Sequence, residues 1–136
     1  MGDNFWLSPD GNQLYTSQGS IFETSTSSEE VLTFTGSIPL AQYEQHGYPW
    51  QANIIAMGEY GDQLVVADDS PVGTLRVLDK SSLILLQSYP KTQVTINERA
   101  YDEEAIAAMF TDEGHLFVIK QGGDYDDQRA RLIRLD

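Results

Sequence analysis

The sequence predicts an all-β protein built from repeated four-stranded antiparallel units, and two observations lead to this prediction. The first is a glycine-containing turn followed by a leucine and an apolar run, a pattern found three times in 136 residues. The second is the spacing of those leucines, Leu14, Leu64 and Leu116, which lie 50 and 52 residues apart. Regular spacing indicates internal repeats, in which each unit buries its apolar face against the next.

The first of these turns is the segment Ser8-Pro9-Asp10-Gly11, which lies between the apolar residues 5–7 and 14–15. Proline fixes φ for a turn, aspartate hydrogen-bonds the nearby backbone, and glycine adopts a positive φ without steric cost. The segment therefore predicts a β-hairpin. Residues 59–62 and 112–114 are degenerate versions of the same turn.

Further alignments support the repeat. Leu7, Met57 and Met109 each stand seven residues before an anchor leucine. Segments 32–39 and 83–90 lie 51 residues apart and share an apolar pair followed by Ser-x-Pro, and segments 75–79 and 132–136 both end in Leu-Asp. We therefore predict a single domain over 1–136, with repeats at approximately 4–39, 53–90 and 105–136.

Each repeat divides into short strand candidates. They are 4–7, 13–17, 20–24 and 31–35 in the first repeat, 53–58, 63–67, 74–79 and 83–89 in the second, and 105–111, 115–120 and 131–135 in the third. Four antiparallel strands in a repeat of this length are typical of a β-propeller blade. The sequence thus predicts a β-propeller-like segment of about three blades, the last of them incomplete.

Residues 102–110 also fit an α-helix, because Asp102 can cap a first turn that contains Glu103 and Glu104. The repeat places 105–109 on the innermost strand of a blade instead. We follow the repeat, since helix propensity is weak against tertiary context. The alternative is a small mixed α/β domain with a helix at 102–110.

The segment SPDGNQLY, residues 8–15, resembles the signature of bacterial β-propeller repeats of the SPDG, YVTN and TolB-like kind. In that family the turn joins the first two strands of a blade, so the resemblance implies a propeller fold and a binding role. It covers about three partial blades. Since propellers close with about four to eight blades, we expect a homo-oligomer or the remaining blades of a longer chain to complete the ring.

Composition narrows the range of partners. The chain has 21 acidic and 8 basic residues and a net charge of −13, which argues against nucleic acid and favours a protein or a neutral or cationic small-molecule ligand. It has no cysteine, which excludes disulfides and thiolate chemistry. The longest apolar stretch, 105–110, is too short to cross a bilayer, and residues 1–7 do not resemble a signal peptide. The sequence therefore predicts a soluble protein with no membrane partner, in a compartment it does not specify.

The motifs of serine hydrolases, zinc proteases, P-loop proteins and dinucleotide-binding proteins are all missing from the sequence. No catalytic residue and no cofactor is therefore predicted. We expect a non-enzymatic binding or assembly scaffold that recognises a ligand or partner on its long-loop face. The alternative is a fragment of a propeller hydrolase whose catalytic residues lie partly outside this chain.

Candidate site residues lie in the long connections 40–51, 68–73, 91–104 and 121–128, which are predicted as loops at one end of the repeats, where binding residues concentrate. The predicted ligand-binding residues are His46, Tyr48, Trp50, Asp68, Asp69, Tyr101 and Asp102. Tyr48 and Trp50 are the leading candidates, since exposed aromatic rings stack on sugars or insert into partners. The other interpretation is that Trp50 packs under its own loop.

A second group of candidates is acidic. Asp124, Asp126 and Asp127 are possible metal ligands, because hard cations bind clustered carboxylate oxygens. The EF-hand pattern fails, since Arg129 stands where that loop needs glycine. Pairing of these carboxylates with neighbouring arginines, in a solvated acidic loop, is the other interpretation.

Overall fold

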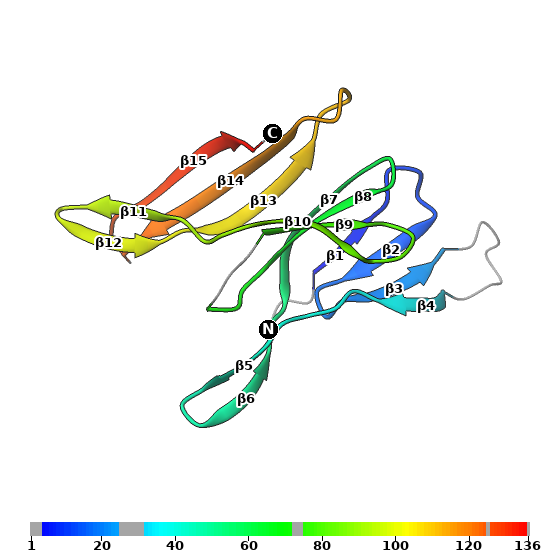
Figure 1. Ribbon diagram of the computed structural model, residues 1–136, viewed down its shortest axis with the longest axis horizontal. Coiled ribbons are helices and arrows are strands. Elements are labelled where there is room, and N and C mark those ends of the chain that lie inside the picture. Colours follow the sequence, from blue (N-terminus) through cyan, green and yellow to red (C-terminus); the bar gives the residue numbers. More distant parts are fainter. Residues whose placement is uncertain (1–3, 25–31, 72–74, 125, 136) are drawn as a thin grey trace.

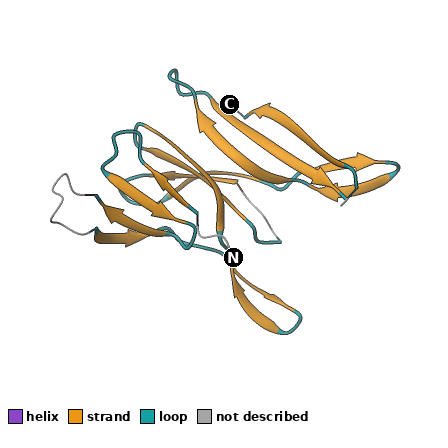
Figure 2. Cartoon of the chain, turned by 180° about the vertical axis from the view of Figure 1, so that it is seen from behind, coloured by secondary structure: helices purple, strands orange, loops and turns teal. Residues whose placement is uncertain are grey.

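The computed structural model describes residues 4–24, 32–71, 75–124 and 126–135, and all regular structure within them is β-strand (Figures 1 and 2). The protein is all-β, as predicted. The alternative helix at 102–110 is wrong, because residues 104–110 form a strand that pairs along its length with its neighbour. Among the described residues there is no helix that could cross a membrane.

Three antiparallel sheets form the body of the molecule. Sheet 1 contains β1 (Phe5–Leu7), β2 (Gln13–Thr16), β3 (Ser20–Glu23) and β4 (Thr33–Ser37). Sheet 2 contains β7 (Ile54–Tyr60), β8 (Gln63–Asp68), β9 (Leu75–Asp79) and β10 (Leu85–Tyr89). Sheet 3 contains β13 (Glu104–Phe110), β14 (Leu116–Gly123) and β15 (Gln128–Arg134). Each strand pairs with its neighbour in sequence, so all three sheets are meanders at the predicted places. Residues 31 and 74, which begin two predicted strands, lie outside the described residues.

The connections between the sheets are not loops, contrary to the prediction for 40–51 and 91–104. The first contains the hairpin β5 (Gln42–Gln45) and β6 (Tyr48–Gln51), and the second contains the hairpin β11 (Gln93–Ile96) and β12 (Arg99–Asp102). Both hairpins turn through two residues with positive φ: His46 (56°) and Gly47 (79°), and Asn97 (52°) and Glu98 (66°). Such turns match the natural twist of paired strands, which explains why these connections form ribbons.

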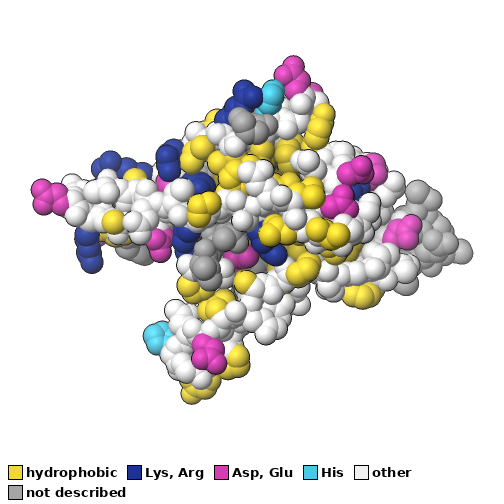
Figure 3. Space-filling view, in the orientation of Figure 1, with side chains coloured by type: hydrophobic (Ala, Val, Ile, Leu, Met, Phe, Trp, Pro, Cys, Tyr) yellow, Lys and Arg dark blue, Asp and Glu magenta, His cyan; other side chains and the backbone are white. Residues whose placement is uncertain are grey.

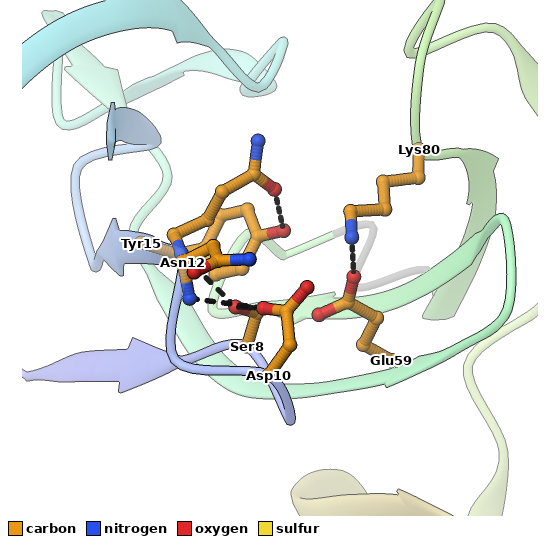
Figure 4. Close-up of polar contacts among 7 residues, drawn as sticks. Ser8, Asp10, Asn12, Tyr15, Glu59 and Lys80 are labelled. Carbon is orange, nitrogen blue, oxygen red and sulfur yellow. Dashed lines mark hydrogen bonds and ion pairs between the residues drawn. The ribbon is translucent and has the colours of Figure 1, made fainter. Parts of the chain in front are cut away.

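The turn at Ser8–Gly11 joins β1 to β2, as predicted (Figure 4). Asp10 Oδ1 accepts hydrogen bonds from Ser8 Oγ at 2.6 Å and from the Asn12 amide at 2.9 Å. Both hydrogen bonds lower the pKa of the Asp10 carboxyl, and the bond from Ser8 has the larger effect. Gly11 has a φ of 76°, so a side chain there would be strained.

Sheet 2 is the centre of the molecule, because both of its faces are buried. One core cluster joins Leu64, Val66 and Leu78 of sheet 2 to residues of sheet 1 that include Tyr15 and Ile21. A second cluster joins the opposite face of sheet 2 to sheet 3; its buried members are Ala56, Val65, Ala67, Leu75, Val77, Leu116 and Val118. This burial explains why β8 is apolar on both faces rather than alternating.

The three sheets stack in one direction along the sequence. Each sheet has two faces. We call the face on the side of the sheet that comes earlier in sequence the preceding face, and the opposite face the following face. Leu64 lies on the preceding face of sheet 2 and Leu116 on that of sheet 3. Leu14 lies on the corresponding face of sheet 1, since its neighbour Tyr15 points toward sheet 2. No described strand covers that face, and Leu14 is therefore only half-buried.

The strand register corrects one sequence alignment. The anchor leucines pair with Leu7, Glu59 and Phe110, so Leu7, Met57 and Met109 are not equivalent positions. The cause is the length of the paired turn, because the anchor leucine lies seven, five and six residues after its partner in sheets 1, 2 and 3. Sequence offset alone does not reveal such a change.

Candidate functional site

The β5–β6 hairpin presents an aromatic face to solvent. In its register Tyr43 lies opposite Trp50, and Gln45 lies opposite Tyr48. These four side chains share one face, because alternate residues of a strand point the same way. Tyr48 is 68% exposed and Trp50 is 52% exposed. The hairpin extends away from the three sheets (Figure 1), and hydrophobic side chains reach its surface at the bottom of Figure 3.

The β11–β12 hairpin occupies the corresponding place between sheets 2 and 3 but is supported. Val94, Ile96, Arg99 and Tyr101 lie on one face of it by register, each 51 residues after a residue on the aromatic face of β5–β6. The hairpin contacts β14, and Ile96 is buried. Val94 packs so closely on Gly122 that a Cβ there would lie 2.8 Å from Val94 Cγ1.

The two hairpins differ because the strands beneath them differ in length. β14 continues to Gly123, seven residues past Leu116, whereas β8 ends at Asp68, four residues past Leu64. The longer strand reaches under its hairpin and covers that hairpin's inner face. Within the described residues β5–β6 has no comparable contact with another strand. The aromatic face of this hairpin is therefore not covered by any described strand.

A polar network fixes the base of β11–β12 to sheet 3. Arg131 donates from Nε to Glu103 Oε2 at 2.8 Å and from Nη2 to Glu103 Oε1 at 2.5 Å. Thr92 Oγ1 donates to Glu103 Oε1 at 2.8 Å and accepts from Lys120 Nζ at 2.9 Å. The Arg131 hydrogen bonds lower the pKa of the Glu103 carboxyl although burial opposes them, and burial lowers the pKa of Lys120. The network joins one carboxylate to two cations, and its hydrogen bonds fix the hairpin base to sheet 3.

Three of the predicted site residues lie on β5–β6. Tyr48 and Trp50 share its aromatic face, and His46 is exposed in its turn. Trp50 Nε1 donates to the Gln45 carbonyl at 3.3 Å, so the indole lies across its own hairpin while half of its surface stays exposed. Trp50 thus contacts its own connection, as one interpretation expected, and keeps an exposed surface, as the other expected.

Asp68 and Asp69 lie at the base of the same hairpin, where they have structural partners. Asp69 Oδ1 accepts from the Asn53 amide at 2.8 Å, at the start of β7. Asp68 is buried and accepts from the Ser70 amide at 3.0 Å, with Arg76 Nη2 at 3.9 Å from Oδ2. Both carboxylates thus order the connection after β8. A ligand role for them stays a prediction.

Tyr101 and Asp102 belong to the other hairpin and lie apart from the aromatic face of β5–β6. Tyr101 OH donates to Asp124 Oδ2 at 3.3 Å, and Asp102 Oδ1 accepts from Gln93 Nε2 at 3.1 Å. The structure therefore separates the seven predicted ligand-binding residues into two groups, one on β5–β6 and at its base after β8, the other on β11–β12 (Figure 1).

The three candidate metal ligands form a turn. Asp124 Oδ1 accepts from the amides of Asp126 and Asp127 at 2.9 and 2.8 Å, and Asp127 pairs with Arg129 at 3.5 Å. In the part of the chain that the structure describes, no group of three or more histidine, aspartate or glutamate side chains is placed to hold a metal ion.

Sequence reasoning did not find the Glu103 network or the support of one hairpin by β14. The available signal was Lys120, a charge that directly follows the apolar run 116–119. No family model, curated protein or solved structure matches this chain.

Proposed function

We propose that this protein is a non-enzymatic binding scaffold of the β-propeller type, whose recognition site is the aromatic face of the β5–β6 hairpin. One observation carries the proposal: Tyr48 and Trp50 stay exposed, while the register-equivalent face of β11–β12 is covered by β14. An isolated two-stranded ribbon is marginal in water, so a ligand that covers these rings stabilises it.

The arrangement of the sheets supports a propeller-type scaffold. Two four-stranded meanders and one three-stranded meander stack face to face in sequence order, with a hairpin in each connection. Rigid stacked sheets hold a connecting segment in a fixed position, which lowers the entropic cost of binding. The hairpins are the segments so positioned.

The chemistry of the aromatic face favours a neutral hydroxylated or cationic ligand. Flat rings of tyrosine and tryptophan stack on sugars and attract cations. Glu44 is exposed on the opposite face of the hairpin. The whole chain carries a net charge of −13, which repels anions. An extended neutral oligosaccharide or a lysine-rich peptide fits these requirements.

Tryptophan fluorescence tests the proposal, because the chain has only two tryptophans. In a Trp6→Phe variant all indole emission reports on Trp50. We expect neutral oligosaccharides or lysine-rich peptides to shift this emission, and Tyr48→Ala to weaken binding by about 1–3 kcal/mol, as for an interface anchor. The matched control is Gln51→Ala, which lies on the opposite face of the hairpin.

Two results would contradict the proposed recognition site. One is unchanged Trp50 emission with both ligand types at millimolar concentration. The other is equal affinity in Tyr48→Ala and Gln51→Ala, which would place binding elsewhere on the molecule.

A further inference from the structure

Both outermost sheets expose apolar faces. On the preceding face of sheet 1, Leu7, Leu14, Phe22 and Phe34 are consecutive cross-strand neighbours and form one row across all four strands. Leu7 is 60% exposed and Phe34 is 58% exposed. Phe5, two residues before Leu7, is exposed on the same face. None of these five residues carries a charge.

The following face of sheet 3 has a similar character. Met109 pairs with Phe117, and Ile119 pairs with both Ala107 and Leu132, so these side chains share one face. Met109 is 50% exposed and Leu132 is 64% exposed. In monomeric soluble proteins contiguous apolar surface of this kind is rare, and it marks an interaction site.

The two exposed faces are of opposite type. Twice within the chain a following face packs on a preceding face: that of sheet 1 on sheet 2, and that of sheet 2 on sheet 3. At the second contact β7 approaches β13 so closely that a Cβ on Gly58 would lie 3.1 Å from the Ala108 carbonyl oxygen. The uncovered preceding face of sheet 1 and following face of sheet 3 are the two halves of a third contact of this kind.

We infer that a second copy of this chain covers both faces, head to tail, in a closed two-fold ring. The following face of sheet 3 in each copy packs on the preceding face of sheet 1 in the other. Two copies supply six sheets, within the range of about four to eight at which stacked sheets close. Closure with two identical contacts leaves neither apolar face exposed.

This inference rests on the stacked arrangement of the proposed scaffold and not on recognition by the β5–β6 hairpin. Charge affects the ring in a predictable way. The row on sheet 1 carries no charge, and the face of sheet 3 carries Arg134 opposite Phe117. Each copy as a whole has a net charge of −13, so the copies repel at long range. Added salt screens that repulsion and strengthens the ring.

Substitutions on one face at a time test the head-to-tail mode. Leu7→Lys blocks the preceding face of sheet 1, and Met109→Lys blocks the following face of sheet 3, both at exposed positions. Sedimentation equilibrium should give twice the chain mass of 15.2 kDa for the unchanged protein and a single chain mass for each variant. Burial of an unpaired lysine should raise the dissociation constant about 100-fold or more. Thr95→Lys, exposed on the β11 hairpin strand, is the control and should stay dimeric.

Mixing the two variants gives the decisive measurement. One contact in the mixed pair joins the intact preceding face of Met109→Lys to the intact following face of Leu7→Lys. Mass should therefore return toward that of two chains only in the mixture. Circular dichroism and thermal unfolding identify any variant that has lost its fold, and Phe34→Lys and Leu132→Lys then replace it.

Three results would overturn the inference. A monomeric unchanged protein at micromolar concentration leaves the faces to another occupant, such as further sheets of a longer chain. Dissociation by only one of the two variants indicates a self-complementary contact between like faces. A mass that grows with concentration beyond two chains indicates an open stack rather than a ring.

Discussion

Glu103 shows how a single side chain can fix an element in place. Its carboxylate is buried at the base of the β11–β12 hairpin and receives hydrogen bonds from Arg131 on β15 and from Thr92 just before β11. Lys120 on β14 joins the same group through Thr92. One carboxylate thus links the hairpin to two strands of sheet 3. Its negative charge strengthens the hydrogen bonds that make this link.

We expect Glu103→Gln to lower the free energy of unfolding by about 1–3 kcal/mol at neutral pH, because it weakens the Arg131 bonds at a buried site. The pKa of Glu103 is held below its ordinary value of 4.5, so its contribution is complete above pH 4.5 and is lost as pH falls through the lower folded-state value. Urea denaturation at several pH values measures this. Glu44→Gln, exposed on β5, is the control. Equal slopes of stability against pH below 4.5 in Glu103→Gln and the unchanged protein would contradict the assignment.

Gly58 is a single residue that permits the backbones of β7 and β13 to approach each other closely. A Cβ there would lie 3.1 Å from both the Ala108 carbonyl oxygen and Val65 Cγ1. We expect Gly58→Ala to destabilise the protein by about 1–3 kcal/mol through overpacking between sheets 2 and 3. Gly36→Ala, which meets nothing within 4 Å, should leave thermal stability equal or slightly higher. A neutral Gly58→Ala would show that the sheets move apart freely.

At the scale of elements, the two hairpins have the same turn geometry but different support. β11–β12 has a buried side, with Ile96 only 3% exposed, whereas Tyr48 and Trp50 of β5–β6 remain at the surface. Under the proposed function, β11–β12 contributes to stability and β5–β6 to recognition. Side chains on the corresponding faces of the two hairpins should then respond differently to truncation.

Ile96→Ala should reduce the free energy of unfolding by about 2–5 kcal/mol, the usual cost of truncating a buried isoleucine. Trp50→Ala, on the exposed hairpin, should change it by only about 0.5 kcal/mol. Parallel urea titrations compare the two. A large loss of stability in Trp50→Ala would mean that the indole belongs to the core and would remove the basis of the proposed recognition site.

The elements that sequence patterns predicted well are those with strong apolar periods and glycine turns. Strands β8 and β9 were found because Val65, Val66 and Val77 lie in apolar runs bounded by turn residues. The hairpin β5–β6 was missed because Pro49 within a strand argues against pairing, although an edge ribbon tolerates it. The polar network was missed because Glu103, Lys120 and Arg131 are far apart in sequence and meet only after sheet 3 forms.

At the scale of the whole molecule, sheet 2 is covered on both faces and sheets 1 and 3 on one face each. The fully buried side chains concentrate on β8, where Leu64, Val65 and Val66 have no exposed surface. Repeat spacing predicted the sheets, but not which face each side chain occupies, since turn length shifts the register by one or two residues. Packing between the sheets determines which face each side chain occupies.

The rate of amide hydrogen exchange should fall as the burial of a strand increases. We expect the amides of β8 to exchange slowest, near the rate set by global unfolding, and those of β5–β6 to exchange fastest among the paired strands. Mass spectrometry of peptides over 63–68 and 42–51 measures both. Comparable protection of the two segments would indicate that the β5–β6 hairpin is covered in solution.

The meander order of the strands also determines how the chain finds its structure. Because every strand in the three sheets pairs with its neighbour in sequence, each sheet closes only short loops as it forms. Pairing between neighbours in sequence lets local hairpins form before distant segments meet. Each sheet can therefore assemble as it leaves the ribosome, one after another. The slow step left for the finished polypeptide is the docking of preformed sheets, when the valines of β8 lose contact with water on both sides.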